Sequence, residues 1–195
     1  MCGIAGALNF SKIPLEEVYS LMRHRGPDDK GVFEAKTQGG LLQFFHARLS
    51  IQDLSTLARQ PMQRGDLCLL FNGEIYNHLQ LREGLDFAFQ THSDTETLLG
   101  LWTHFGEAFL ERLGMLDGMF AFVLYDAKNQ KLYFARDRMG KKPLFYYKQE
   151  SKMVFASELN TICGILKFFK MPLEIEEEAI KFYLESGFFY QDSTP

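Results

Sequence analysis

The residue at position 2 is a cysteine, and this position offers a chemistry that few other positions allow. Initiator methionine is commonly removed when the next residue is small, and loss of Met1 would leave Cys2 with a free α-amino group. Such an amine has a pKa of about 7.7–8.0, so near neutral pH it can take the thiol proton of the same residue. Cys2 is therefore a candidate nucleophile that carries its own base. A cysteine placed there by chance would look the same, so the candidate needs support from the rest of the chain.

Attack on an amide carbonyl needs hydrogen-bond donors for the oxyanion that forms, and Asn72-Gly73 is the candidate pair. The dipeptide follows the apolar run LCLLF (67–71), and a glycine there lets another group approach the backbone closely. The side-chain amide of Asn72 and the backbone N–H of Gly73 can together bind an oxyanion. Asn-Gly is also a strong signal for an ordinary hairpin turn. The residues alone leave both interpretations open.

Two charged residues are candidates for holding the ends of an amino acid. The planar fork of Arg48 suits a carboxylate, although a solvated arginine at a strand end would look the same. Asp94 lies at the start of an expected helix, where its carboxylate either receives a substrate ammonium group or complements the helix dipole. Together the two would neutralise both ends of a zwitterion. They therefore favour a free amino acid over a peptide as the substrate.

The hydrophobic pattern predicts the elements that position these residues. Pro14 opens one helical pattern, Ser93 and Glu96 match a capping box that opens another, and the charged segment 23–31 is expected to be a loop. Further patterns predict strands over residues 3–10, 41–51, 67–76, 119–126, 131–137, 143–148 and 152–157, and helices over 108–113 and 176–186. Two groups of strands with helices between and after them indicate an α+β fold.

The composition bounds the class of protein. With 195 residues, of which 46% are hydrophobic and 14% aromatic, the chain fits one sizeable domain with a large core. The net charge of −4 and the lack of a long basic run argue against a nucleic-acid partner. Three cysteines without metal-binding spacing favour free thiols and a cytoplasmic location. We expect a soluble protein without membrane contact, because no segment matches a signal peptide or a membrane span.

Nine segments match a known family in the family's order: MCGIAG, MRHRGPDDKG, HARLSIQDLS, QPM, FNGEIYNH, SDTETLL, LDGMFAFVLYD, ARDRMGKKPLFYY and FASELNTI. Through them, residues 1 to about 160 resemble the class II, or N-terminal-nucleophile, glutamine amidotransferase domain of glutamine-dependent asparagine synthetase. The RHRGPDD segment favours this type over two sister groups. Glucosamine-phosphate synthases typically carry an RGYDS-like segment there, and purine-pathway amidotransferases an HRGQ-like segment.

The resemblance implies a role for each candidate residue. Cys2 would be the nucleophile, and Asn72 and Gly73 would form the oxyanion hole. Arg48 would clamp the α-carboxylate of glutamine, while Asp94 would receive its α-ammonium group. Further contacts would come from Glu74, also at the ammonium group, from the backbone of Leu49, Ile51 and Gln52, and from the loop around Arg25.

The resemblance also implies a fold and a reaction. Family members are four-layer αββα sandwiches. They hydrolyse the side-chain amide of L-glutamine to glutamate and ammonia, which normally feeds an ATP-dependent synthetase domain that makes asparagine from aspartate or amidates a related carboxylate. The glutaminase step needs no metal or organic cofactor, and ATP and Mg²⁺ are expected only for the synthetase domain. Whether the protein forms a homodimer is left open.

Two domains are therefore expected, only the first of them complete in this chain. Residues 2–160 would be the glutaminase domain, and residues 161–195 the connector and the start of a truncated synthetase domain, because the family's SGGLDS-like pyrophosphate loop is not in the sequence. A group of basic residues either faces that second domain or forms a solvated hairpin edge: Arg136, Arg138, Lys141 and Lys142.

Two other interpretations remain at this point. A binding or regulatory module would hold glutamine, or a partner chain, without turning glutamine over. An N-terminal-nucleophile hydrolase of another kind would act on a different amide. The first predicts no adduct between Cys2 and an electrophilic glutamine analogue. The second is tested by comparing turnover of glutamine with that of γ-glutamyl peptides.

Overall fold

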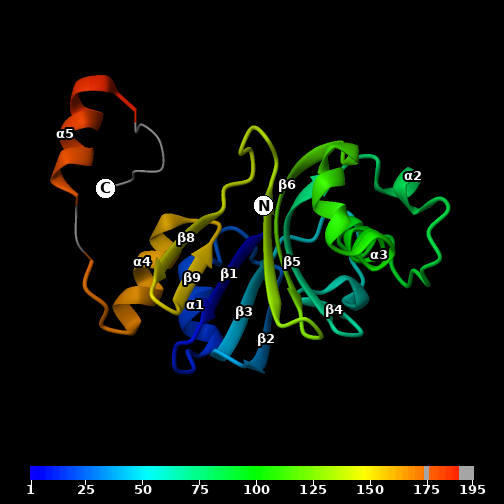
Figure 1. The fold of residues 1–195 in the computed structure, drawn as a ribbon, viewed down its shortest axis with the longest axis horizontal. Helices are drawn as coiled ribbons and strands as arrows, with labels where there is room; N and C mark the ends of the chain where they lie inside the picture. The colour runs from blue at the N-terminus through cyan, green and yellow to red at the C-terminus, as the bar shows by residue number, and fades with distance from the viewer. Residues whose placement is uncertain (174–175, 189–195) are drawn as a thin grey trace.

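The computed structural model describes residues 1–173 and 176–188, in which two antiparallel sheets stack face to face (Figure 1). The first sheet, in the order β2-β3-β1-β9-β8, consists of β1 (Gly3–Leu8), β2 (Asp29–Thr37), β3 (Gly40–Arg48), β8 (Phe145–Gln149) and β9 (Lys152–Ala156). The second, in the order β4-β5-β6-β7, consists of β4 (Met62–Arg64), β5 (Leu67–Ile75), β6 (Gly118–Asp126) and β7 (Lys131–Arg136).

Helices cover the outer face of each sheet, which confirms the expected α+β fold with four layers, αββα. The first sheet carries α1 (Leu15–Met22) and α4 (Leu159–Phe168); the second carries α2 (His78–Arg82), α3 (Asp94–Phe105) and the 3₁₀ helix η2 (Gly106–Met115). A short 3₁₀ turn, η1 (Thr56–Ala58), precedes β4, and α5 (Glu177–Ser186) stands apart from the sandwich (Figure 1). In the described part of the chain, no helix combines the length and apolarity needed to cross a membrane.

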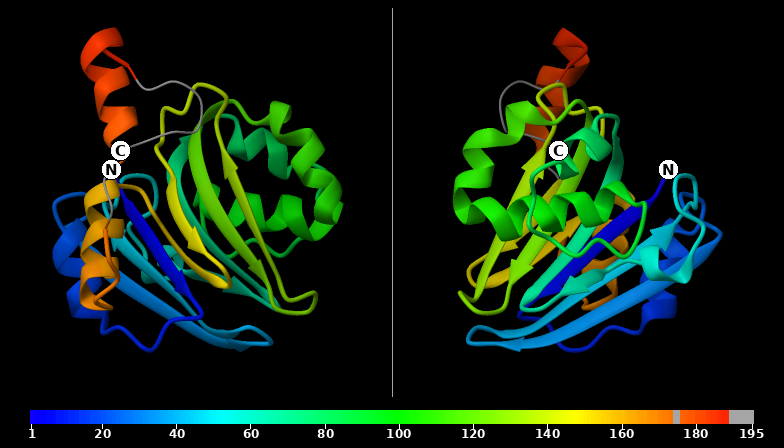
Figure 2. Two further views of the ribbon diagram at one scale, coloured as in Figure 1. Left: turned by 60° about the vertical axis from the view of Figure 1, so that its left-hand side comes forward. Right: turned by 90° about the vertical axis from the view of Figure 1, so that its right-hand side faces the viewer.

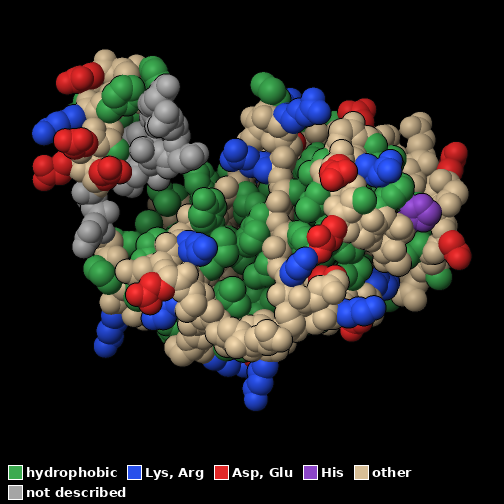
Figure 3. Space-filling view, in the orientation of Figure 1, with side chains coloured by type: hydrophobic (Ala, Val, Ile, Leu, Met, Phe, Trp, Pro, Cys, Tyr) green, Lys and Arg blue, Asp and Glu red, His purple; other side chains and the backbone are tan. Residues whose placement is uncertain are grey.

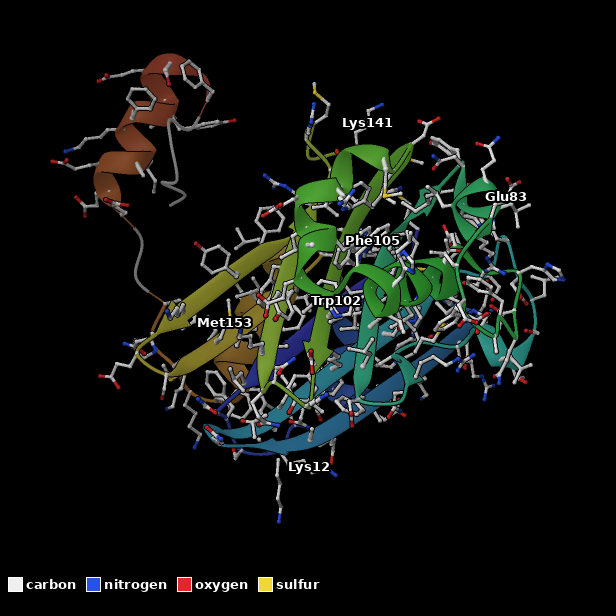
Figure 4. The ribbon with its side chains drawn as sticks, turned by 45° about the vertical axis from the view of Figure 1, so that its right-hand side comes forward. Lys12, Glu83, Trp102, Phe105, Lys141 and Met153 are labelled. Carbon is white, nitrogen blue, oxygen red and sulfur yellow. The ribbon has the colours of Figure 1, made fainter. Side chains whose placement is uncertain are left out.

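Three apolar layers hold the sandwich together. Strand residues alternate between two faces, and here both faces of each sheet are covered. Residues such as Ile4, Phe44 and Leu70 fill the space between the sheets. Val18 of α1 is buried on the outer face of the first sheet, and Trp102 of α3 (labelled in Figure 4) on that of the second. Full burial of such a side chain contributes roughly 1.5–3 kcal/mol, so the three layers supply the main stabilisation.

The capping box predicted at the start of α3 forms only in part. Ser93 is the N-cap, and its Oγ accepts a hydrogen bond from the Thr95 N–H at 3.1 Å. A complete box would return a bond from Glu96 to the Ser93 N–H, but that N–H is donated to Thr91 Oγ1 at 3.1 Å. The buried Glu96 carboxylate instead accepts the Thr91 N–H at 2.7 Å and pairs with Arg64 at 2.7 Å. The reciprocal bond was wrongly predicted because these partners satisfy both groups.

Five described elements did not follow from the hydrophobic pattern: β2, η1, β4, α2 and α4. β2 begins at Asp29, inside the predicted loop 23–31, and it is an edge strand whose residues alternate between exposed and half-buried. It therefore lacks the apolar run that marks the central strands. β4 has only three residues. The apolar run that follows residue 158 did not indicate that a helix, α4, forms there.

The predicted domain boundary at residue 160 falls inside α4. Ile162, Ile165 and Leu166 of this helix are buried against the first sheet, so the packed domain includes the whole of α4. Residues 174–175 and 189–195 of the predicted connector and truncated second domain lie outside the described residues. The assignment of the chain after α4 to a connector and a second domain stays a prediction.

Candidate active site

Figure 2 shows the N-terminus and the loop that follows β3 side by side at one end of the sandwich. Residues of both segments line a pocket of about 160 Å³. Pockets for drug-sized ligands hold roughly 300–1,000 Å³, so this smaller pocket suits a molecule the size of one amino acid. Its wall contains the residues that the sequence analysis assigned to a substrate site, with the exception of Arg25: Cys2, Arg48, Leu49, Ile51, Gln52, Asn72, Gly73, Glu74 and Asp94.

Alternation along the strands brings three of these residues together. Ile4 of β1 faces the second sheet, and Leu70 of β5 faces the first. By the same period of two, the side chains of Cys2, of Arg48 at the end of β3 and of Asn72 in β5 are directed to the space between the sheets. Three segments far apart in the sequence therefore meet at one end of the inter-sheet layer.

The thiol of Cys2 lies against the backbone of Leu49. Its Sγ is 3.6 Å from the Leu49 carbonyl oxygen and accepts the Leu49 N–H at 3.4 Å. Arg25 holds the Cys2 backbone by donating from Nε to its carbonyl oxygen at 3.0 Å. Burial raises the pKa of the Cys2 thiol, while the Leu49 N–H and the charge of Arg48 oppose that rise. At neutral pH the thiol is therefore protonated and needs a base before it can attack.

His46 does not supply that base. Its ring is buried in β3 and is not part of the pocket wall. Burial, together with the charge of Arg48, lowers the pKa of His46 to about 3, so the ring is neutral and a very weak proton acceptor. The base that the sequence analysis predicts is the α-amino group of Cys2, which only removal of Met1 would free.

Asn72 and Gly73 lie inside β5, where they pair with Ala121 and Phe120 of β6. The alternative interpretation of this dipeptide as a hairpin turn is therefore wrong. An added Cβ at Gly73 would lie 2.4 Å from the Met119 carbonyl oxygen, so this close strand pairing requires glycine. Asn72 is 1% exposed, and its Nδ2 has no hydrogen-bond partner among the described residues. Since buried amide donors nearly always have partners, this one indicates that a ligand acceptor binds in the pocket.

The backbone N–H of Gly73 is directed to the same pocket. Alternate residues of a strand direct their N–H groups to the same edge. The N–H groups of Phe71 and Ile75 leave β5 on the side away from β6, where they reach Gln60 Oε1 at 2.6 Å and Asp94 Oδ2 at 3.0 Å. Gly73 lies between these two residues and lines the pocket. Its N–H therefore forms a second donor beside the Asn72 amide.

The guanidinium group of Arg48 is buried and held in one orientation. Nη1 donates to the Ser55 carbonyl oxygen at 3.1 Å, and Nη2 donates to the Asp53 carbonyl oxygen. The Asp29 carboxylate lies 3.9 Å from Nη1. A guanidinium group has five N–H donors, so three remain. A fork fixed in this way at a pocket wall can bind a carboxylate through two parallel hydrogen bonds.

Asp94 and Glu74 place two carboxylates at the pocket. Asp94 is 6% exposed, and burial raises its pKa to about 6, with the charge of Glu74 adding to the rise and the N–H groups of Ile75 and Thr95 opposing it. Gln52 Nε2 donates to Glu74 Oε1 at 3.3 Å. The pair forms an attractive site for an ammonium group. Among the described residues, no group of three or more His, Cys, Asp or Glu side chains could hold a metal ion.

Two placements made from the sequence were wrong. Arg25 does not line the pocket. It contacts the backbone of Cys2 from outside the pocket, pairs with Glu158 at 2.8 Å and lines a neighbouring cavity. Lys142 was grouped with three basic residues that would either face a second domain or form a solvated hairpin edge, but it is 5% exposed and lines the pocket. The other members of that group are exposed as expected: Arg136, Arg138 and Lys141. A run of basic residues in a loop has no pattern that indicates which of them turns inward.

Residues 1–195 match the family model described as a glutamine amidotransferase domain. The glutamine-hydrolyzing asparagine synthetase 1 of Bacillus subtilis is 38% identical over 100% of this chain, and the glutamine-hydrolyzing asparagine synthetase B of Escherichia coli is 37% identical over 87%. The chain spans 31% of the length of each of these relatives.

A solved structure of the glutamine phosphoribosylpyrophosphate amidotransferase of Bacillus subtilis is similar to 84% of this chain, with a TM-score of 0.69. This chain covers 43% of that structure at 24% sequence identity, so the likeness concerns the fold alone. The fold, the pocket and the match along the whole chain agree with one another: this protein chain belongs to the glutamine amidotransferase family.

Proposed function

We propose that this chain is the glutaminase part of a glutamine-dependent asparagine synthetase, with Cys2 as its nucleophile once Met1 is removed. One observation carries the proposal. The Cys2 thiol and the Asn72 amide, whose Nδ2 lacks a partner among the described residues, line one pocket from opposite sheets. A nucleophile that faces a preorganised oxyanion donor is the arrangement that amide cleavage requires.

The substrate in this proposal is L-glutamine. The free donors of Arg48 bind its α-carboxylate, and Asp94 with Glu74 binds its α-ammonium group. Both ends of the amino acid are then fixed, which leaves the side-chain amide to extend toward Cys2. Leu49, Ile51 and Gln52 form the wall beside it. A peptide would lose one of the two charged contacts, and for this reason a free amino acid is favoured.

In the first half of the reaction, the α-amino group of Cys2 takes the thiol proton and the sulfur attacks the amide carbon. The oxyanion accepts hydrogen bonds from Asn72 Nδ2 and the Gly73 N–H. The resulting ammonium group of Cys2 then protonates the leaving nitrogen, and ammonia departs as the carbonyl reforms. A γ-glutamyl thioester on Cys2 remains.

In the second half, the neutral α-amino group takes a proton from water, and the hydroxide attacks the thioester carbon. The same two donors bind the second oxyanion. Collapse of this intermediate breaks the carbon–sulfur bond, the thiolate recovers its proton from the amine, and glutamate leaves. Only groups of the chain and water take part, so this step uses no metal or organic cofactor.

We further propose that the ammonia passes to a synthetase domain, which uses ATP and Mg²⁺ to make asparagine from aspartate or to amidate a related carboxylate. Support comes from the relatives named above, which are glutamine-hydrolyzing asparagine synthetases. This chain spans 31% of the length of each of them. The segment after α4 would be the connector to that domain. A cytoplasmic location is part of the same proposal, and the three free cysteines support it.

An electrophilic glutamine analogue tests the proposal directly. We expect a single adduct on Cys2, located by peptide mass spectrometry, in protein whose intact mass shows that Met1 has been removed. A matched preparation that keeps Met1 should form no adduct and release no glutamate from glutamine, because its thiol lacks the adjacent base. Absence of an adduct in the processed protein would favour a binding module. Faster turnover of γ-glutamyl peptides than of glutamine would favour another amide hydrolase.

Replacement of Asp94 by asparagine is expected to raise the KM for glutamine roughly 10- to 100-fold, as loss of a charge-assisted bond of about 1.5–3 kcal/mol predicts. The asparagine oxygen can still accept the Ile75 N–H, so the start of α3 is retained. The pH dependence has a defined sign, because the pKa of Asp94 is raised to about 6. In the parent protein KM should increase as pH falls through this value, since the carboxyl group becomes neutral.

Steady-state kinetics at several pH values measure both effects. The Asp94→Asn variant should lack the rise of KM near pH 6, and its kcat should stay within a few-fold of the parent value. Asp66→Asn serves as a control, because Asp66 is an exposed carboxylate outside the pocket. An unchanged KM in Asp94→Asn would show that Asp94 does not bind the ammonium group.

A further inference from the structure

Lys142 is a buried cation that the glutaminase mechanism above does not use. It lies in the loop between β7 and β8 and lines the Cys2 pocket, whereas Lys141 is exposed at the tip of the loop, where basic side chains gather (Figures 3 and 4). Its Nζ lies 2.9 Å from Met1 Sδ, which is a weak acceptor. In residues 1–173 and 176–188 it forms no ion pair with a carboxylate. Burial of an ammonium group without a counter-ion is costly, so the position indicates a function.

Asp137 holds the loop so that Lys142 turns inward. Its buried carboxylate accepts hydrogen bonds from four backbone N–H groups. Three of them, from Phe120, Met139 and Lys142, lie at 3.1 Å, and the fourth, from Lys141, lies at 2.9 Å. Four bonds to one carboxylate fix the backbone of Lys142 against the start of β6. The fold therefore fixes the backbone of Lys142 beside the pocket, and its ammonium group lies next to the N-terminal residue.

Other charged groups around the thiol and Lys142 are engaged elsewhere. Arg25 pairs with Glu158 at 2.8 Å, and Arg48 is bound to carbonyl oxygens and lies near Asp29. Burial and the charge of Arg25 lower the pKa of Lys142, while Glu74, the Cys2 thiolate and Asp137 act to raise it. Two further charged groups act on the thiol: the N-terminal ammonium group of Met1, which is lost when that residue is removed, and Asp94, at the ammonium end of the pocket.

We propose that the ammonium group of Lys142 keeps the α-amino group of Cys2 in its neutral, proton-accepting form and stabilises the thiolate that attacks glutamine. Lys142 is a positioning residue in this scheme: it transfers no proton and acts only through its charge. Removal of Met1 frees Nζ from its contact with the Met1 side chain and exposes the Cys2 amine to this charge. The inference deepens the proposed function and rests on it.

The sign of the effect follows from electrostatics. A nearby cation favours loss of a proton from its neighbours. The amine and the thiol of Cys2 exchange a proton, so they titrate as a coupled pair with an apparent pKa that belongs to both. Lys142 lowers that apparent pKa whichever group gives up the proton. Removal of its charge must therefore move formation of the reactive pair to higher pH.

The test compares Lys142→Met, which removes the charge, with Lys142→Arg, which keeps it, and with Lys141→Met as the matched control in the same loop. The readout is the rate of Cys2 alkylation by iodoacetamide between about pH 5.5 and 9, measured on ligand-free protein shown by intact mass to lack Met1. Peptide mass spectrometry separates alkylation of Cys2 from that of Cys163. The acidic limb of kcat/KM for glutamine is measured in parallel.

We expect the midpoint for Lys142→Met to move upward by about 0.5–1 pH unit, with alkylation roughly three- to tenfold slower on the acidic side of the midpoint. Lys142→Arg and Lys141→Met should keep the parent midpoint. An unshifted midpoint in Lys142→Met overturns the proposal, even if KM for glutamine rises, because that result would assign Lys142 to substrate binding. If Lys142→Met does not fold, Lys142→Gln replaces it.

Alkylation does not depend on glutamine turnover, so the two proposals can fail separately. A parent protein that reacts with iodoacetamide but does not hydrolyse glutamine contradicts the proposed function, and the alkylation midpoints still decide the role of Lys142. A parent that hydrolyses glutamine while all variants share one midpoint contradicts only the role of Lys142.

Discussion

Replacement of Cys2 by alanine is expected to lower kcat for glutamine hydrolysis by roughly 10⁴- to 10⁶-fold, the range seen when the nucleophile of a covalent mechanism is removed. The variant keeps the oxyanion donors and the charged pocket but cannot form the thioester. We therefore expect glutamine to bind with nearly the parent affinity. A coupled assay for glutamate measures the first effect, and isothermal titration calorimetry measures the second.

Cys163→Ala is the matched control for this experiment. Cys163 is a half-buried free thiol on α4, outside the pocket, so its loss should leave kcat and KM unchanged. Residual activity of the Cys2→Ala protein within tenfold of the parent would contradict the mechanism. Loss of glutamine affinity in that protein would show that the substitution disturbs the pocket, and a melting curve would then test whether the fold is retained.

Replacement of Asn72 by alanine is expected to lower kcat by about 10²–10³-fold with little change in KM, because the lost donor serves the oxyanion and not the bound substrate. Asn72→Asp should be at least as impaired, since a carboxylate in the same place repels the oxyanion. Steady-state kinetics on the three proteins separate this pattern from a binding defect. A rise in KM without a fall in kcat would contradict the assignment.

The stability of the Asn72 variants provides a second, independent check. In the described structure Asn72 Nδ2 donates to no protein group, so its removal breaks no hydrogen bond of that nitrogen. The free energy of unfolding should therefore change by only about 1 kcal/mol. Gln60→Ala is the contrasting variant, because Gln60 Oε1 accepts the Phe71 N–H at 2.6 Å inside the fold. It should destabilise the protein more, and urea denaturation can compare the two.

Most of the central strands could be predicted from the hydrophobic pattern, because buried strands leave long apolar runs. The runs at 41–51 and 67–76 correspond to β3 and β5. β2 escaped prediction because an edge strand with one half-buried face has no such run. The place of α4 depends on packing against the first sheet, and local sequence does not contain that information.

The candidate residues were found from their chemical types and from the resemblance, and the pocket contains all of them except Arg25. Their electrostatic state could not be predicted in the same way. The pKa of Asp94 rises to about 6 because the residue is buried next to Glu74, and burial depends on how α3 meets the second sheet. The inward turn of Lys142 depends on Asp137, whose four bonds bring together β6 and the β7–β8 loop.

The order of residues along the chain thus specifies the proposed nucleophile, the amine that removal of Met1 would place beside it, and the side chains that can bind an oxyanion, a carboxylate and an ammonium group. Those properties are local, because they belong to the chemistry of each residue and its immediate neighbours. Only the tertiary structure decides that Cys2 and Asn72 face each other, since they lie on different sheets whose facing sides are set by the packing of the inter-sheet core. Burial and counter-charge are likewise properties of the packed molecule, and they determine which of these groups are charged.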